Sequence, residues 1–184
     1  MVETTLLITL GAIFVLLIFS AFFSGTETAL TGSSRPLMHQ LEQNGNTQAG
    51  LVNRLHEQKG RLIGTILIGN NLVNILASAL ATSISIAAFG EAGIAYATII
   101  MTILVVMFSE ILPKTYALQN ADRVALKVAP FIRPIIFLFS PFTAATSFIT
   151  RITFLVFGIK LHNKDEFVTG VEELRGAIEL HKGD

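Results

Sequence analysis

Two glutamates lie within otherwise apolar stretches of this sequence, where a charged side chain needs a reason to be kept. Glu27 follows a phenylalanine-rich run, and Glu110 lies shortly before Lys114. An ionisable residue inside a membrane helix costs about 2.5 to 3.5 kcal/mol, so it is usually retained for a partner, an ion or a pathway. Each glutamate alone could also reach the interface or pair with a neighbouring base, Arg35 or Lys114. One carboxylate by itself therefore decides little.

Three asparagines occur between these glutamates, again in an apolar run. Asn70, Asn71 and Asn74 have i, i+3 and i, i+4 spacing, which places Asn74 on the same side of a helix as both others. A single asparagine in a membrane helix most simply bonds to a neighbouring helix. Three amides so close together, at a depth similar to that of two carboxylates, favour a binding site instead.

The backbone next to the two glutamates is also unusual. Pro113 cannot donate a hydrogen bond to the Ser109 carbonyl, which predicts a kink there, and Gly25 beside Ser24 permits a matching irregularity. Carbonyls freed in a membrane are tolerated where protein, water or an ion satisfies them. Carboxylate, amide, hydroxyl and carbonyl oxygens together suit a hard cation such as Mg²⁺, Ca²⁺ or Na⁺. The absence of cysteine from the chain, and of histidine from these stretches, disfavours zinc and copper.

The elements that must position these residues are predicted by composition and by the distribution of charge. The 184 residues are 52% apolar and 14% charged, which is too apolar for an ordinary soluble domain of this size. Glu3 is the only charge among residues 1–26, and residues 62–90 and 92–109 carry none. We predict an all-α membrane protein with three transmembrane helices, at about residues 4–31, 62–90 and 92–117, plus a juxtamembrane helical belt.

The basic residues predict the orientation of these spans. Short loops rich in Lys and Arg stay in the cytoplasm, and here they follow the first and third spans: Arg35, Arg54, Lys59, Arg61, Lys114, Arg123, Lys127 and Arg133. We therefore expect a multi-pass protein of the cell (inner) membrane with its amino terminus outside and its carboxyl terminus in the cytoplasm. Counted at about 1.5 Å per residue from the basic anchors, the glutamates and asparagines lie in the inner half of the membrane.

The remaining segments are expected to lie at the cytoplasmic face. Residues 34–60 are polar, with a turn at Asn44-Gly45-Asn46, and predict two short interfacial helices. Residues 130–159 are apolar but interrupted by prolines and arginines, so a fourth span competes with interfacial or re-entrant helices. We favour the interfacial alternative, with interfacial helices over about residues 121–159. Residues 1–160 would form the transmembrane domain. Residues 161–184 would begin an acidic cytoplasmic helical region that continues beyond this chain.

Enzyme chemistry finds little support in the sequence. All four histidines (His39, His56, His162 and His181) fall in predicted loops or in the tail, so no Ser-His pair and no His-Glu-x-x-His site lies within the spans. Gly-rich phosphate loops are also absent. Equal numbers of basic and acidic residues give no reason to expect a nucleic-acid partner. We expect a non-enzymatic protein whose partner is the lipid bilayer.

Three of these motifs occur together in a known family. They are Phe23-Ser24-Gly25-Thr26-Glu27-Thr28-Ala29, Gly69-Asn70-Asn71-Leu72-Val73-Asn74 and Ser109-Glu110-Ile111-Leu112-Pro113-Lys114. In this order and spacing they resemble the transmembrane domain of the CorC/CNNM family of magnesium transporters. The resemblance covers essentially the whole chain.

The resemblance carries its own expectations. It implies three transmembrane helices and a cytoplasmic belt, assembled as a homodimer that exports Mg²⁺ in exchange for Na⁺. It also implies that ATP-binding CBS domains normally follow, which this chain does not reach. The Mg²⁺ site implied by the family pattern comprises Ser24, the Gly25 backbone, Asn70, Asn74 and Glu110. Glu27 and Ser109 would lie close by, as candidates for Na⁺.

Two functions of different classes follow from these expectations. In the first, a Mg²⁺ ion enters between the three helices from the cytoplasm and leaves outward after a conformational change driven by inward Na⁺. In the second, the chain is a membrane-anchored Mg²⁺ sensor or structural module, whose bound ion holds the helices together without crossing the membrane. The sequence alone does not separate the two.

Overall fold

The computed structural model describes the backbone of residues 2–157, and every element in that range is helical. The prediction of an all-α membrane protein is therefore confirmed. The chain divides into two compact units, Met1–Ala144 and Ala145–Asp184. The predicted acidic region 161–184 lies outside the described residues.

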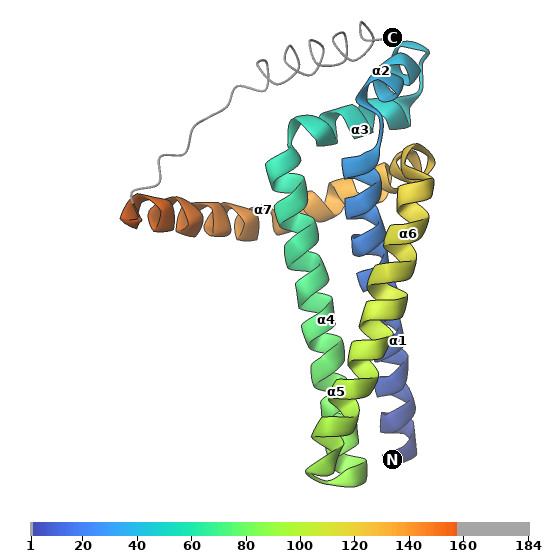
Figure 1. Ribbon diagram of the computed structural model, residues 1–184, viewed down its shortest axis with the longest axis vertical. Coiled ribbons are helices and arrows are strands. Elements are labelled where there is room, and N and C mark those ends of the chain that lie inside the picture. The colour runs from blue at the N-terminus through green and yellow to red at the C-terminus, as the bar shows by residue number, and fades with distance from the viewer. Residues whose placement is uncertain (1, 158–184) are drawn as a thin grey trace, which may run out of the picture. The chain divides into compact units, whose positions relative to one another are not determined.

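Three helical columns stand side by side in the first unit (Figure 1). The first column is α1, the second is α4, and the third is α5, which continues through a π-helical segment, η1, into α6. Their bounds are Val2–Gly32 for α1, Lys59–Phe89 for α4, Ala92–Leu104 for α5, Val105–Ile111 for η1 and Leu112–Gln119 for α6. These columns cover the three predicted spans.

The turn between α4 and α5 depends on two glycines. Gly90 has a φ of 64°, a left-handed conformation that favours glycine, and its N–H donates to the Ile86 carbonyl at the end of α4. Gly93 lies so close to α4 that a Cβ at this position would overlap the Ser85 carbonyl. The close approach lets α4 and α5 pack as a tight antiparallel hairpin.

Two short helices follow α1, as predicted for residues 34–60. They are α2, Arg35–Gln43, and α3, Thr47–Glu57. The Ser34 side chain caps α2, and the Asn46 side chain caps α3 by accepting from two backbone N–H groups. Gly45, with a φ of 87°, makes the turn between them.

The last described helix is α7, Ala121–Val156, which runs without interruption through Pro130, Pro134 and Pro141. The prolines therefore do not divide this segment as predicted. By length and composition α7 is also a fourth helix that could cross a membrane, where three were predicted. Its portion in the first unit runs across the three columns instead of alongside them (Figure 1), and this direction favours the interfacial alternative.

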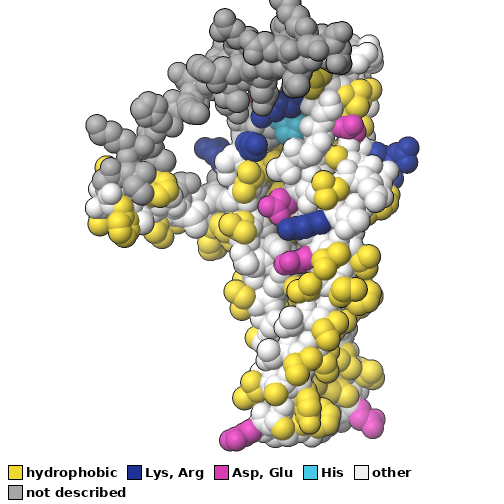
Figure 2. Space-filling view, viewed as in Figure 1, with side chains coloured by type: hydrophobic (Ala, Val, Ile, Leu, Met, Phe, Trp, Pro, Cys, Tyr) yellow, Lys and Arg dark blue, Asp and Glu magenta, His cyan; other side chains and the backbone are white. Residues whose placement is uncertain are grey.

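A buried apolar cluster joins α2, α3 and α7, which together form the belt, to the columns. Phe23 and Leu30 of α1 pack with Met38 of α2, Ile66 of α4 and Ile132 of α7, and all five are at most 4% exposed. Farther along the columns, hydrophobic side chains face outward over most of the surface, with acidic side chains at the lower end (Figure 2). This is the pattern of a protein whose columns are solvated by lipid.

One polar residue of the belt is placed differently from the prediction. His56 was expected in a solvated loop, but it lies on α3 and is only 9% exposed. Its Nε2 lies 2.7 Å from the Leu30 carbonyl oxygen and 3.2 Å from the Ser33 hydroxyl. The imidazole is buried because it bonds to backbone at the end of α1, which ties α3 to the first column.

Candidate cation site between the columns

A partly buried hydrogen bond fixes the register of α1 against α4. The Ser20 hydroxyl donates to Asn70 Oδ1 over 2.8 Å, and Ser20 is fully buried. One turn farther, a Cβ on Gly69 would lie 2.6 Å from the Phe23 ring, so the ring packs directly against the α4 backbone. Asn70 is therefore held facing α1. Ser20 was missed by the sequence analysis, because an isolated serine in an apolar helix gives no distinctive pattern.

The third column joins this site through η1. Ser109 is fully buried, and its hydroxyl donates to the Leu17 carbonyl of α1 over 3.1 Å. Leu17 lies about one turn from Ser20, so Asn70 and Ser109 contact the same stretch of α1. The structure therefore brings two of the predicted site residues, from two different columns, against a third column.

Four buried oxygens in this region have no hydrogen-bond partner among the described residues. They are Ser24 Oγ and Thr26 Oγ1 on α1, and Thr65 Oγ1 and Asn74 Oδ1 on α4. A buried oxygen without a partner costs about 1–3 kcal/mol, so a native structure keeps it where water or an ion satisfies it. Ser24 and Asn74 were predicted as site residues. Thr26 and Thr65 were not predicted: Thr26 lies between the predicted Gly25 and Glu27, and Thr65 lies five residues before Asn70.

The π-helical segment carries both Ser109 and Glu110. Here the N–H of Leu112 donates to the Met107 carbonyl, five residues back instead of four. The next position in this register is Pro113, which has no N–H to offer the Phe108 carbonyl. The predicted kink at this proline is thus a widened turn, of a kind that often occurs at functional sites. Glu110 is half-buried at the end of this turn.

Gly25 acts differently from the prediction. α1 is a regular α-helix through this residue, so the expected irregularity beside Ser24 is wrong. A Cβ on Gly25 would instead lie 3.5 Å from Pro113 Cβ, which shows that Gly25 allows α1 to pass close to the end of η1. The backbone of α1 and the proline turn therefore meet at the level of the unpartnered Ser24 hydroxyl.

Glu27 has a protein partner already. Its carboxylate lies 3.7 Å from Lys114 Nζ, and both side chains are partly exposed. This is the ion pair that the sequence left open as an alternative for Glu27. The described residues also contain no group of three or more Asp, Glu, His or Cys side chains that could hold a metal ion. A cation between the columns would therefore rely mainly on neutral oxygens, with Glu110 as the available charge.

A groove of about 470 Å³ opens between α4 and the α5–η1 column, and Asn74 lies in its wall. Its other polar lining residues are hydroxyls and an amide, in an otherwise apolar surface: Asn71, Ser78, Thr82, Thr98 and Thr102. Polar side chains of α4 and α5 thus continue from Asn74 along this groove.

These features define a multi-pass α-helical membrane protein in which neutral buried oxygens lie on neighbouring columns and one half-buried carboxylate lies on the π-helical segment. Residues 11–184 match the family model described as the Cyclin M transmembrane N-terminal domain. The chain therefore belongs to the CNNM family, as its three motifs predicted. Membrane proteins of this family are broadly linked to ion transport.

Several known proteins are similar to this chain. The UPF0053 inner membrane protein YfjD of Escherichia coli is 38% identical over 172 residues, which cover 90% of this chain and 40% of that protein. A UPF0053 protein of Haemophilus influenzae is 35% identical over 175 residues, covering 93% and 41%. A more distant relative, the polyamine export protein of Haemophilus influenzae, is 27% identical over 170 residues, covering 85% and 39%. The chain thus spans about 40% of the length of these relatives.

Proposed function

We propose that this chain is the membrane domain of a secondary transporter that exports Mg²⁺ from the cytoplasm, driven by inward movement of Na⁺. The observation that carries the proposal is a pair of buried oxygens without protein partners among the described residues, Ser24 Oγ and Asn74 Oδ1, on the two columns that pack against the π turn. Mg²⁺ prefers oxygen ligands in near-octahedral geometry at about 2.0 to 2.1 Å and keeps several of its waters. Neutral oxygens with one carboxylate suit such a partly hydrated ion.

Two other predicted site residues, Ser109 and Asn70, make hydrogen bonds that leave lone pairs on their oxygens free to bind a cation. Ser109 uses its hydroxyl proton toward the Leu17 carbonyl, so the lone pairs of its oxygen stay available. Asn70 Oδ1 accepts one bond from Ser20 and has a second lone pair. In this proposal Glu110 supplies the negative charge, while the amides and hydroxyls replace water ligands. Glu27 would serve Na⁺ only after release from Lys114.

The proposal includes the setting of the site. The amino terminus would lie outside and the carboxyl terminus in the cytoplasm of the cell membrane, because the basic side chains visible in Figure 2 lie in the upper part of the molecule. The working assembly would be a homodimer with cytoplasmic CBS domains. The protein would be neither an enzyme nor a partner of nucleic acid.

Calorimetric titration of Mg²⁺ into the purified protein tests the site. We expect wild-type binding, with Glu110→Gln and Asn70→Ala weakening it at least tenfold. Glu91→Gln is the matched control, since it removes an exposed carboxylate at the far end of the hairpin and should leave affinity unchanged. Equal loss in the control, or no loss in Glu110→Gln, would contradict the assigned site.

Flux measurements separate transport from sensing. Proteoliposomes loaded with Na⁺ are expected to take up Mg²⁺ from outside, and Glu110→Gln should abolish that uptake. Binding without flux would support the membrane-anchored sensor instead. Since one relative is named for polyamine export, spermidine belongs in the same assay as a competing cargo. If micromolar spermidine displaces Mg²⁺, the proposed site stands but the transported cargo is a polyamine.

A further inference from the structure

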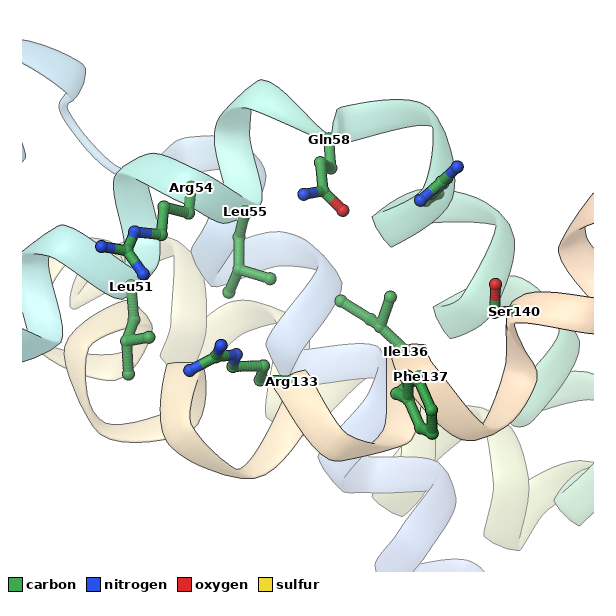
Figure 3. A pocket seen from close by; sticks show the side chains of 9 residues that line it. Leu51, Arg54, Leu55, Gln58, Arg133, Ile136, Phe137 and Ser140 are labelled. Atoms are coloured by element: carbon green, nitrogen blue, oxygen red, sulfur yellow. The ribbon is translucent and has the colours of Figure 1, made fainter.

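A second site lies in the belt, away from the cation site. A pocket of about 380 Å³ opens between α3, the start of α4 and α7. Three arginines line it, Arg54 from α3, Arg61 from α4 and Arg133 from α7, and no acidic residue does. Arg54 and Arg133 extend toward the same side of the opening from facing helices (Figure 3). We call this the arginine pocket.

The charges of the arginine pocket are not balanced by the described part of the protein. None of the three guanidinium groups lies within 4.0 Å of a carboxylate there. Arg133 is also the only charged residue between Lys127 and Arg151, in the apolar part of α7. An isolated charge in such a helix needs a partner. Three convergent cations without one create a site for an anion with several acceptor oxygens.

The rest of the lining distinguishes a lipid from a soluble anion. Leu51 and Leu55 of α3 and Ile136 and Phe137 of α7 form its apolar side, and Phe137 is 85% exposed. Arg61 directly precedes the uncharged run of α4 that begins at Leu62, so the pocket lies where the span enters the membrane. Cations beside exposed apolar side chains at this depth match a phosphate headgroup and its acyl chains.

Polar groups at the rim add hydrogen-bond donors. Gln58, the residue before α4, lines the pocket, and its side chain does not cap the helix. The first N–H groups of α4 are therefore without a side-chain cap beside the arginines. Ser140 of α7 supplies a hydroxyl on the other side of the same opening. Guanidinium, amide and hydroxyl donors together suit the oxygens of a phosphodiester.

We propose that the arginine pocket binds the phosphate headgroup of an anionic phospholipid, with the acyl chains lying along Ile136 and Phe137. Anionic lipids concentrate in the cytoplasmic leaflet, and basic pockets beside membrane helices on that side bind such headgroups. The lipid would join α3, α4 and α7 and so hold the belt against the columns. The site does not depend on the identity of the transported ion.

Native mass spectrometry of the full chain in detergent tests this site. Phosphatidylglycerol is titrated into wild type, into R54Q/R133Q and into the control R123Q/K127Q, which removes two exposed charges of α7 outside the pocket. We expect R54Q/R133Q to bind this lipid about tenfold to thirtyfold more weakly, and the control to stay within about threefold of wild type. R61Q alone serves where the double variant does not fold, with a loss of about fivefold expected.

Two further arms identify the source of the phosphate. Phosphatidylcholine, which carries no net charge, is expected to bind much more weakly than phosphatidylglycerol, and millimolar inorganic phosphate is expected not to displace the lipid. Displacement by inorganic phosphate would show a soluble anion to be the ligand. Equal weakening in R123Q/K127Q would show only general attraction of charge. Either result, or unchanged lipid binding in R54Q/R133Q, overturns the proposal.

Discussion

Replacing Ser24 with alanine is expected to stabilise the ion-free protein and, at the same time, to weaken Mg²⁺ binding. Ser24 is fully buried and its Oγ has no hydrogen-bond partner among the described residues. Alanine removes the unsatisfied oxygen and leaves almost no cavity. If the oxygen is kept for a cation, stability without the ion and affinity for the ion must change in opposite directions.

The two magnitudes follow from burial and from linkage. Relieving one buried oxygen that lacks a partner should raise the free energy of unfolding by about 1–3 kcal/mol. At a Mg²⁺ concentration of about 100 times Kd, binding stabilises the wild type by about 2.7 kcal/mol. A variant with tenfold weaker affinity keeps about 1.4 kcal/mol of that stabilisation. Mg²⁺ should therefore add about half as much to Ser24→Ala as to wild type.

Equilibrium unfolding in detergent micelles, with and without Mg²⁺, measures both quantities in one experiment. Thr65→Val is the matched control, since Thr65 Oγ1 is also buried without a partner but was not predicted as a ligand. It should gain stability in the same way and keep the full Mg²⁺ increment. The comparison separates relief of a buried oxygen from loss of a ligand.

Two results would refute the reasoning. If Ser24→Ala lowers the ion-free stability while its helical content is unchanged, then the hydroxyl has a partner and the oxygen is not held in reserve. If its Mg²⁺ increment equals that of wild type, Ser24 does not bind the ion. Loss of the increment in Thr65→Val as well would mean that either substitution simply disturbs the packing of α1 against α4.

Three other substitutions test separate contacts by the same unfolding assay. Ser20→Ala should have the opposite sign to Ser24→Ala, costing about 1–2 kcal/mol, because it leaves Oδ1 of the partly buried Asn70 without its donor; a gain in stability would contradict the hydrogen bond. Glu27→Gln should change stability by less than about 1 kcal/mol, because its ion pair is exposed, and a larger loss would indicate a buried role. Gly69→Ala should cost about 1–3 kcal/mol, since the new Cβ would displace the Phe23 ring; wild-type stability would show that the ring moves freely.

The spans could be predicted because lipid excludes charge. Glu3 is the only charge among residues 1–26, and the uncharged runs at residues 62–90 and 92–109 show where α4 and the third column cross. The two short helices of residues 34–60 were predicted from their polar composition and the turn at Asn44-Gly45-Asn46, and their caps, Ser34 and Asn46, are typical residues at helix starts. These features depend on local chemistry, which a sequence states directly.

Features that depend on contacts between helices could not be predicted in the same way. Pro113 indicated a break, but the π turn arises where Ser109 reaches the Leu17 carbonyl of another helix. The helix α7 continues through its prolines, and it packs against the columns through Ala125, Ala129 and Ile132. That contact between helices is not visible in the local sequence. Ser20 and His56 are polar residues whose partners lie far away in the sequence, so neither gave a local signal.

The arrangement of the prolines in α7 has a consequence for where that helix can lie. At 100° per residue, Pro130, Pro134 and Pro141 fall within an arc of about 40°. Each of them is exposed, and the arc lies roughly opposite the buried residues Ala129 and Ile132. The outward stripe of α7 is therefore the one on which three backbone amides are missing.

That stripe sets a solvation requirement on the helix. Each proline withholds the bond that the carbonyl four residues earlier would accept, and an unpaired carbonyl costs several kcal/mol in hydrocarbon but little in contact with water. With three unpaired carbonyls on one side, α7 surrounded by lipid tails would be destabilised by a free energy comparable to the stability of a whole domain. At the membrane surface the same side would meet water and headgroups, so the backbone itself, independently of any side chain, favours a position of α7 along the boundary.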